Sequence, residues 1–359
     1  MVLITRAPVR INLGGGGTDF PAYYERHGGL AISATISYYV YTILTPGWSD
    51  NVQIISADYR ALCQRSTGDD LLWNDDLRLP KAITYHFNLC DGLTVFLASQ
   101  VPPGTGLGSS GSVAVSMIKA LAFWCGLDLA PRQVAELACY IEIEKMAMPV
   151  GKQDQYAAAF GGLNAVKLSR DGVAVEPLRV LSGTRKALES RLMLFFTGAS
   201  RQSSTILRQQ QEAIQGEDRN MVRQLDAIKE LAGEIRMVLE SGDLDAFGNL
   251  LHLIWMEKRQ LTDGITNPFL DQCYQAAREN GAQGGKVTGA GGGGFLMLCC
   301  PEDRQEDVTE ALTNLGARRW HFSLDDQGVQ VMEAVPWSRQ HAPHRFPVVM
   351  EGSQVRAGL

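Results

Sequence analysis

The sequence of 359 residues has no apolar run long enough to span a membrane and no apolar leader. The most apolar stretch, residues 28–44, is interrupted by four hydroxyl side chains, whereas a spanning helix needs about 20 apolar residues. At the start of the chain, Arg6 comes before a long apolar run can form. We therefore expect neither export nor a membrane partner.

Cysteine patterns typical of disulfide or zinc proteins are missing, and so is an excess of positive charge. The seven cysteines contain no C-x-x-C pair, and none of the six histidines pairs with a cysteine at a metal-ligand spacing. This favours free thiols in a reducing cytoplasm. Lysine and arginine number 33 against 39 acidic residues, so the net charge is −6, which argues against nucleic acid as the main partner.

The hydrophobic pattern is that of an α+β protein with two domains. Alternating apolar residues from Ile32 to Leu44 indicate a half-buried strand, and helical spacing appears from Val113 to Trp124 and from Val134 to Lys145. The chain from about 201 to 282 is almost entirely helical in pattern, and the part that follows has the order β-α-β-β. We expect the first domain over residues 1–185, the second over 186–335, and a tail over 336–359 that is an edge appendage or poorly ordered.

Glycine is abundant, with 37 residues, and it clusters in three segments. They are Gly14-Gly15-Gly16-Gly17-Thr18-Asp19, residues 103–111 (PGTGLGSSG) and residues 286–294 (KVTGAGGGG). Glycine lets the backbone approach a ligand closely and point N–H groups at an anion. The second segment precedes a helix expected to begin near Ser112, whose N-terminal N–H groups would face a phosphate. Any one such loop is commonly a tight turn, but three together favour phosphate and sugar binding.

The second segment also matches G-x-G-x-x-G, the dinucleotide fingerprint, but its context is wrong. Pro102 and Pro103 follow the preceding strand, no βαβ unit is evident, and Asp128 follows a helix where an acidic residue after a second strand is required. The sequence has no G-x-x-x-x-G-K-[ST] either, which excludes a P-loop kinase.

An acidic segment supplies candidate metal ligands and a candidate base. Glu142 and Glu144 lie near the end of a helix that Pro149 must stop, and Asp154 opens the next segment after a Pro/Gly turn. Carboxylates placed in this way can hold Mg²⁺ and orient a hydroxyl nucleophile. The alternative is that both glutamates face solvent and that Asp154 is a helix N-cap.

These segments together resemble the GHMP small-molecule kinases. The resemblance rests on Ala7-Pro8-Val9-Arg10-Ile11-Asn12-Leu13, on Pro-Pro-Gly-Thr-Gly-Leu-Gly-Ser-Ser at residues 102–110 and on residues 286–294, and it covers residues 3 to about 336. It implies an N-terminal domain like ribosomal protein S5 domain 2, a ferredoxin-like C-terminal domain and a site between them. Gly111 stands where many members have alanine, a small change to which we give no functional meaning.

The resemblance also implies roles for individual residues. ATP phosphates would lie on the second segment, at Pro103, Gly104, Thr105, Gly106, Leu107, Gly108, Ser109 and Ser110. Ser110 and Glu144 would bind Mg²⁺, with Glu142 as the second choice. Asp154 would be the catalytic carboxylate and Arg10 its basic partner. The sugar would contact Gly16, Gly17, Thr18 and Asp19, together with Gly291 and Gly292.

Within the family, the segments GGGGTDFP and PVGKQDQYAAAFGG most resemble the D-glycero-D-manno-heptose 7-phosphate kinases. This implies phosphorylation of the anomeric hydroxyl by ATP to give the 1,7-bisphosphate, towards nucleotide-activated heptose. The phosphate already on the sugar needs side-chain cations, for which Arg201 and, as a helper, Lys152 are the candidates. A kinase for galactose, fucose or a mevalonate-type alcohol and a non-catalytic sugar and ATP sensor are the alternatives. The oligomeric state stays open, with a homodimer as one option.

Overall fold

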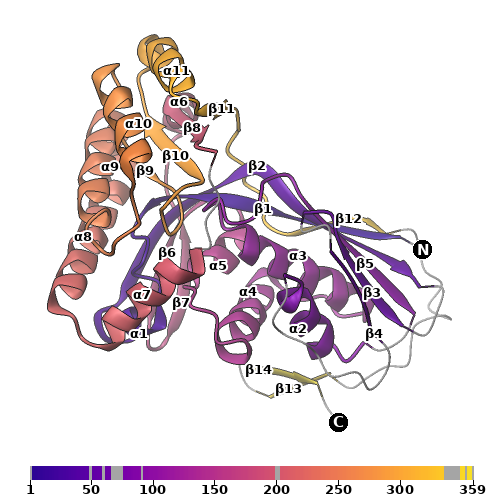
Figure 1. Cartoon of the computed structure of the whole chain (residues 1–359). Coiled ribbons are helices and arrows are strands. Elements are labelled where there is room, and N and C mark those ends of the chain that lie inside the picture. Colours follow the sequence, from indigo (N-terminus) through magenta and orange to yellow (C-terminus); the bar gives the residue numbers. More distant parts are fainter. Residues whose placement is uncertain are drawn as a thin grey trace.

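The computed structural model describes residues 2–47, 51–58, 61–65, 76–89, 92–198, 203–334, 348–351 and 354–357, and two sheets form the body of this part (Figure 1). The larger sheet has the order β12-β1-β2-β5-β3-β4, and β6 pairs with β2 and with β7. Its strands are β1 (Leu3–Gly14), β2 (Gly29–Pro46), β3 (Val52–Ser56), β4 (Ala61–Arg65), β5 (Leu93–Ser99), β6 (Leu163–Ser169), β7 (Gly172–Pro177) and β12 (Gln330–Ala334).

Helices of the N-terminal half cover one face of this sheet (Figure 1). They are α2 (Arg78–His86), α3 (Ser109–Trp124), α4 (Pro131–Cys139), the π-helical turn Tyr140–Lys145 and α5 (Gln153–Phe160), while α1 (Pro21–His27) lies beside β6. The helix α3 is apolar almost all round, because it packs between the sheet and the other helices of this layer.

The smaller sheet has the ferredoxin-like arrangement that the resemblance implies. Its strands are β8 (Leu192–Phe196), β9 (Gly284–Val287), β10 (Phe295–Cys299) and β11 (Arg318–Trp320), in the antiparallel order β11-β8-β10-β9. Helices α7 (Ser203–Gln215), α8 (Arg219–Ser241), α9 (Leu244–Lys258) and α10 (Pro268–Glu279) separate β8 from β9, and the 3₁₀ turn Glu302–Arg304 and α11 (Gln305–Asn314) separate β10 from β11. This is the order β-α-β-β-α-β, with the helices α7 to α10 in the place of the first helix. The α+β fold is therefore confirmed.

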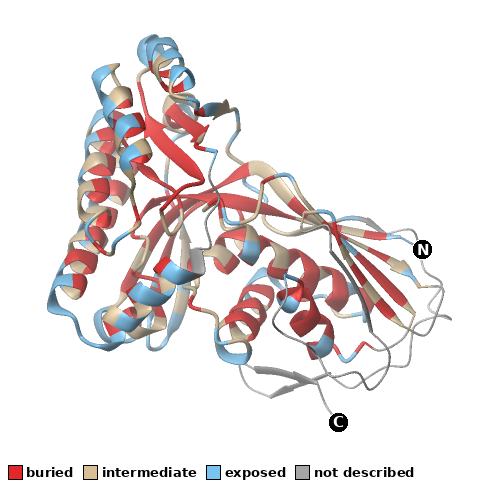
Figure 2. Ribbon diagram, viewed as in Figure 1, coloured by how far each residue is buried: buried red, intermediate tan, exposed pale blue. Residues whose placement is uncertain are grey.

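Each domain has a hydrophobic cluster made mainly of its own residues, and a third cluster contains residues of both domains. Ile11 and Ile32 of the large sheet pack in one buried cluster with Leu194 of β8, Ile235 of α8 and Phe295 of β10. Residues 31–36 of β2 are therefore buried on both faces, and only its later part shows the alternation of a half-buried strand. In Figure 2 the strands of both sheets are mostly buried, while the outer sides of the helices are exposed.

The expected domain limits stay a prediction, and two elements of the structure depart from them. The boundary at residue 185 falls inside α6 (Ser182–Arg191). The last strand of the expected β-α-β-β order is β12, and it pairs with β1 of the large sheet although its residues lie within the expected second domain. Hydrogen bonding to an edge strand depends on long-range geometry, which sequence periodicity does not contain.

Of the tail from residue 336, the structure describes a hairpin, β13 (Val348–Glu351) paired with β14 (Gln354–Ala357). The five cysteines whose side chains are described are free thiols, and Cys125 alone among them is exposed. None of the helices in the described ranges combines the length and the apolarity that a membrane span requires.

Candidate active site

All three glycine segments meet in one pocket, which lies where the two domains join. The large-sheet domain contributes Gly16, Gly17 and Asp19, the segment Gly104–Ser110 and the start of α5. The second domain contributes side chains of α7 and α9 and the loop after β9. Glycine-rich backbone and a few polar side chains therefore line the pocket, and both domains contribute to its wall.

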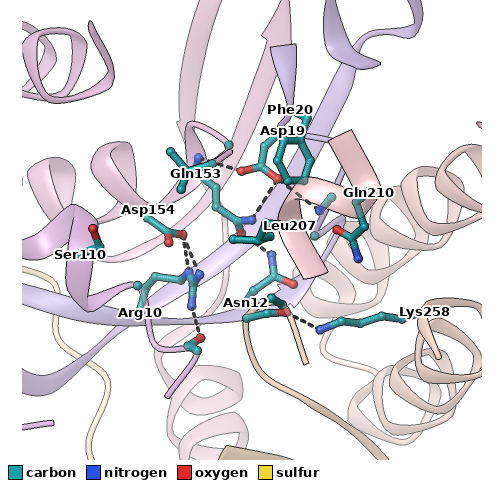
Figure 3. Close-up of a pocket in the computed structure, with 18 of the residues that line it drawn as sticks. Arg10, Asn12, Asp19, Phe20, Ser110, Gln153, Asp154, Leu207, Gln210 and Lys258 are labelled. Carbon is teal, nitrogen blue, oxygen red and sulfur yellow. Dashed lines mark hydrogen bonds and ion pairs between the residues drawn. The ribbon is translucent and has the colours of Figure 1, made fainter. Parts of the chain in front are cut away.

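Arg10 and Asp154 form the ion pair at the centre of this pocket (Figure 3). The Arg10 side chain donates two hydrogen bonds to Asp154 Oδ1, from Nε at 2.9 Å and from Nη2 at 2.6 Å, and a third from Nη1 to the Gly106 carbonyl at 2.7 Å. Asp154 lies in the first turn of α5, where Lys152 is the N-cap. The alternative role of Asp154 as an N-cap is therefore wrong. Its second oxygen, Oδ2, has no protein donor among the described residues.

A second carboxylate, Asp19, is held at the upper side of the pocket in Figure 3 by three N–H donors. The Gly17 N–H, the Gln153 backbone N–H and the Gln153 amide donate at 3.2, 3.1 and 3.0 Å. Burial and the nearby Asp154 charge raise the pKa of Asp19. The Gln153 amide oxygen accepts in turn from Asn12, whose own oxygen accepts from the buried ammonium of Lys286. This chain of contacts connects the first glycine segment with the third and fixes the position of Asp19.

The second glycine segment leads directly into α3 and presents the N-terminus of that helix to the pocket. The helix begins at Ser109, three residues earlier than expected, with Gly108 in the left-handed region as its N-cap. Gly106 packs against Gly289 of the third segment, and a Cβ on Gly289 would come within 2.4 Å of the Gly106 Cα. The two glycine segments thus make backbone contact that a side chain at either position would prevent.

Between the two glutamates, the structure places Glu142 and not Glu144 beside Ser110. Ser110 Oγ donates to Glu142 Oε1 at 2.9 Å, and the Gln155 amide donates to Glu142 Oε2 at 2.6 Å. Glu144 is exposed. Successive residues of a helix are turned by about 100°, so side chains two positions apart point in nearly opposite directions and only one can face α3. The structure therefore places Glu142, the second choice as a Mg²⁺ ligand, beside Ser110, and it places Glu144, the first choice, away from it.

The buried carboxyl of Glu142 has no cation beside it in the described structure. Its exposed fraction is 1%, and burial raises its pKa to about 7, against hydrogen bonds from Gln155 and Ser110 that lower it. No cluster of three or more His, Cys, Asp or Glu side chains that could hold a metal ion occurs in the described part of the chain. An ion at Glu142 and Ser110 would therefore not be enclosed by a cluster of such side chains from the described residues.

Several predicted site residues do not line the pocket. Thr18 is buried and donates to the carbonyls of Gly15 and Leu30, which shapes the first glycine turn. Lys152 lies over the ring of Tyr24 and away from the cavity. Five other predicted site residues are also absent from the pocket lining, namely Pro103, Thr105, Leu107, Gly291 and Gly292. Arg201 lies outside the described residues.

The pocket also contains residues that sequence reasoning missed, namely Asn12, Gln153, Gln210 and Lys258. Asn12 and Gln153 stand inside the motifs that were singled out, so their position was a usable signal. Gln210 and Lys258 each stand in the apolar stripe of a helix. Gln210 lies between Ile206 and Ile214, and Lys258 lies four residues after Ile254. A polar side chain in an apolar stripe was therefore a usable signal as well.

Comparisons with known proteins agree with this geometry. The family models of the GHMP kinases N terminal domain and the GHMP kinases C terminal match residues 78–162 and 213–318. A D-glycero-alpha-D-manno-heptose 7-phosphate kinase of Campylobacter jejuni is 31% identical over 335 residues, which cover 91% of this chain and 97% of that protein.

Solved structures match along nearly the whole chain. A D-glycero-D-manno-heptose 1-phosphate kinase from Bacteroides thetaiotaomicron is 29% identical with a TM-score of 0.75, covering 94% of this chain and all of that one. A galactokinase from Lactococcus lactis shares the fold, with 17% identity, a TM-score of 0.74 and coverage of 92% and 95%. The chain therefore belongs to the GHMP kinases, a family of enzymes that transfer a phosphoryl group to small molecules.

Proposed function

We propose that this chain is an ATP-dependent kinase that phosphorylates the anomeric hydroxyl of D-glycero-D-manno-heptose 7-phosphate to give the 1,7-bisphosphate. The observation that supports this best is the complete pocket between the two domains, with the Arg10–Asp154 pair at its centre and the N-terminus of α3 at one side. The 31% identity to a heptose 7-phosphate kinase over nearly the full length supports the substrate class.

The residues around α3 fit a nucleotide with Mg²⁺. The N–H groups of the second glycine segment and of the first turn of α3 suit a chain of phosphates. Glu142 is a buried carboxylate without a cation, and Ser110 Oγ is hydrogen-bonded to it. One carboxylate, one hydroxyl and phosphate oxygens form the donor set that Mg²⁺ prefers in kinases, so we assign the ion to Ser110 and Glu142.

Asp154 is positioned to act on the acceptor hydroxyl. Its Oδ1 is fixed by Arg10, which leaves Oδ2 free to accept the hydroxyl proton. The sugar oxygen then bonds to the γ-phosphorus, the bond from that phosphorus to the β–γ bridging oxygen breaks, and ADP leaves. Arg10 stabilises the charge on Asp154 and, from the same position, the charge that develops on the phosphoryl oxygens. Asp19 accepts hydrogen bonds from other sugar hydroxyls.

We place this reaction in the cytoplasm, in keeping with the free thiols of the described cysteines. Arg201 stays a candidate for contact with the sugar phosphate. The order in which the two phosphates are added needs a direct test, because one structural relative is named a heptose 1-phosphate kinase.

The test is ATP consumption by the purified chain with a panel of acceptors. The panel contains heptose 7-phosphate, heptose 1-phosphate, free heptose, galactose, fucose and mevalonate. We expect heptose 7-phosphate to give the highest kcat/KM by a wide margin. A preference for heptose 1-phosphate would reverse the order in which the two phosphates are added to the heptose. A preference for another acceptor would replace the proposed substrate. Binding of ATP and sugar without turnover would indicate a sensor.

A further inference from the structure

Lys258, the last residue of α9, is a buried cation at the pocket wall. Its side chain is 7% exposed and lines the pocket, and its ammonium donates to the carbonyls of Val287 and Gly289 at 2.8 and 2.6 Å. An ammonium group has three N–H donors, so one remains available. Lys258 makes no ion pair within the described part of the chain, whereas the other lining cation, Arg10, is paired with Asp154.

Gln210 of α7 is a second buried polar side chain at the same wall. Its exposed fraction is 5%, it lines the pocket, and its amide forms no hydrogen bond with any described residue. Gln210 is not among the described side chains whose polar atoms are fully buried without a partner, so its amide is accessible from the pocket. The amide N–H and C=O groups can therefore hydrogen-bond to a polar group of a ligand there.

Both side chains lie on the side of the pocket away from the start of α3. Figure 3 shows Ser110 at one side, Gln210 and Lys258 at the other, and Arg10 and Asp154 between them. With the nucleotide phosphates at Ser110 and the acceptor hydroxyl at Asp154, the far end of the acceptor molecule points to Gln210 and Lys258.

We propose that Lys258 and Gln210 form the subsite for the phosphate monoester that the acceptor sugar already carries. This assignment rests on the proposed function, and it explains how a chain with net charge −6 can hold a dianion in addition to ATP. The two residues come from different helices of the second domain, so they clamp the phosphate between α7 and α9.

The electrostatics around Lys258 agree with an anionic ligand. Burial and the nearby Arg10 lower the pKa of Lys258 to about 7, since a charged ammonium is poorly solvated there. A phosphate dianion at the third N–H would remove this penalty, and charge-assisted hydrogen bonds are about twice as strong as neutral ones.

The experiment compares kcat/KM for D-glycero-D-manno-heptose 7-phosphate with kcat/KM for the same heptose without phosphate. We measure this preference ratio in the wild type, in Lys258→Met and in Gln210→Met. Lys229→Met, which changes a lysine of α8 outside the pocket, is the matched control. General damage to the fold lowers both values alike, so the ratio isolates the phosphate contact.

We expect Lys258→Met to reduce the ratio roughly 10- to 100-fold, as for the loss of a hydrogen bond to a charged group, with little change in KM for ATP. Gln210→Met reduces it less, and Lys229→Met leaves it unchanged. If Lys258→Met does not fold, Gln210→Met still tests the subsite, because it leaves no backbone carbonyl unpaired.

Two results would overturn the subsite while leaving the kinase assignment intact: an unchanged ratio in both pocket variants, or a ratio lost only in Arg201→Ala. A wild type with no preference for the phosphorylated sugar would instead contradict the proposed function itself.

Discussion

At the scale of single residues, the two carboxylates Asp154 and Glu142 differ in their ionic and hydrogen-bonding partners. Asp154 is bonded to a guanidinium through one oxygen, while Glu142 is buried against a hydroxyl and an amide and forms no ion pair with a described residue. A carboxylate with one free oxygen suits proton transfer, and a buried carboxylate without a cation suits a metal ion. The two roles thus follow from the surroundings, although the side chains carry the same chemical group.

For Asp154, we predict that Asp154→Asn reduces kcat by about 10²–10⁴-fold, because the amide cannot accept the hydroxyl proton. The Kd for ATP should change much less than kcat, since the proposed role of Asp154 is to act on the acceptor hydroxyl. Steady-state kinetics and nucleotide titration measure the two quantities. A variant that keeps nearly full kcat would reduce Asp154 to a structural partner of Arg10.

For Glu142, we predict that Glu142→Gln raises the Mg²⁺ concentration for half-maximal rate, while Glu144→Gln, the matched control on the exposed side, does not. In the wild type this requirement should fall as the pH rises through about 7, because the proton that competes with Mg²⁺ is lost there. The variant should lose this pH dependence. The opposite pattern in the two variants would assign the metal to Glu144.

The Glu142 carboxyl should also make the stability of the ligand-free protein depend on pH. The folded pKa of Glu142 is raised from 4.5 to about 7, so the unfolded chain ionises first as the pH rises. The free energy of unfolding should therefore decrease between about pH 4.5 and 7, and less steeply in Glu142→Gln.

At the scale of elements, the site depends on how closely α3 and α5 approach each other. Gly111 in the first turn of α3 has no side chain, and a Cβ there would come within 2.8 Å of the Asp154 Cβ and 3.0 Å of its carbonyl carbon. The substitution that seemed neutral from the sequence thus lies directly against the proposed catalytic residue.

We predict that Gly111→Ala moves the start of α5 and lowers kcat, with a loss of stability of about 1–3 kcal/mol from overpacking. Gly126→Ala is not a suitable control because its φ is positive, whereas Gly233→Ala is, since a Cβ on Gly233 of α8 meets nothing within 4 Å. Thermal unfolding and kcat are the measurements. Full activity in Gly111→Ala would show that α5 tolerates the displacement.

The sequence predicts the elements that have regular periodicity and the motifs that are dense in glycine. Strand β2 and helix α3 lie where the patterns place them, and the three glycine segments meet in one pocket. The short helices α1 and α2 have too few turns for a periodic signal. The orientation of Glu142 depends on packing between helices, which local patterns do not determine. Periodicity predicts that Gln210 and Lys258 are buried, but not that they face a pocket.

At the scale of the whole molecule, a hydrophobic cluster with residues of both domains holds the walls of the pocket together. The cluster that joins β1 and β2 to β8, α8 and β10 fixes the second domain against the first, so that α7 and α9 complete a wall that the N-terminal domain lacks. Acceptor recognition can therefore vary through the second domain while the residues proposed for phosphoryl transfer stay in the first.

The measurement that tests the central claim most directly is identification of the product by ³¹P NMR after reaction with heptose 7-phosphate and ATP. The account predicts one new phosphate resonance coupled to the anomeric proton, with ADP formed in equal amount and the original 7-phosphate retained. A new phosphate at any other carbon, or ADP formed with inorganic phosphate and no bisphosphate, would contradict it.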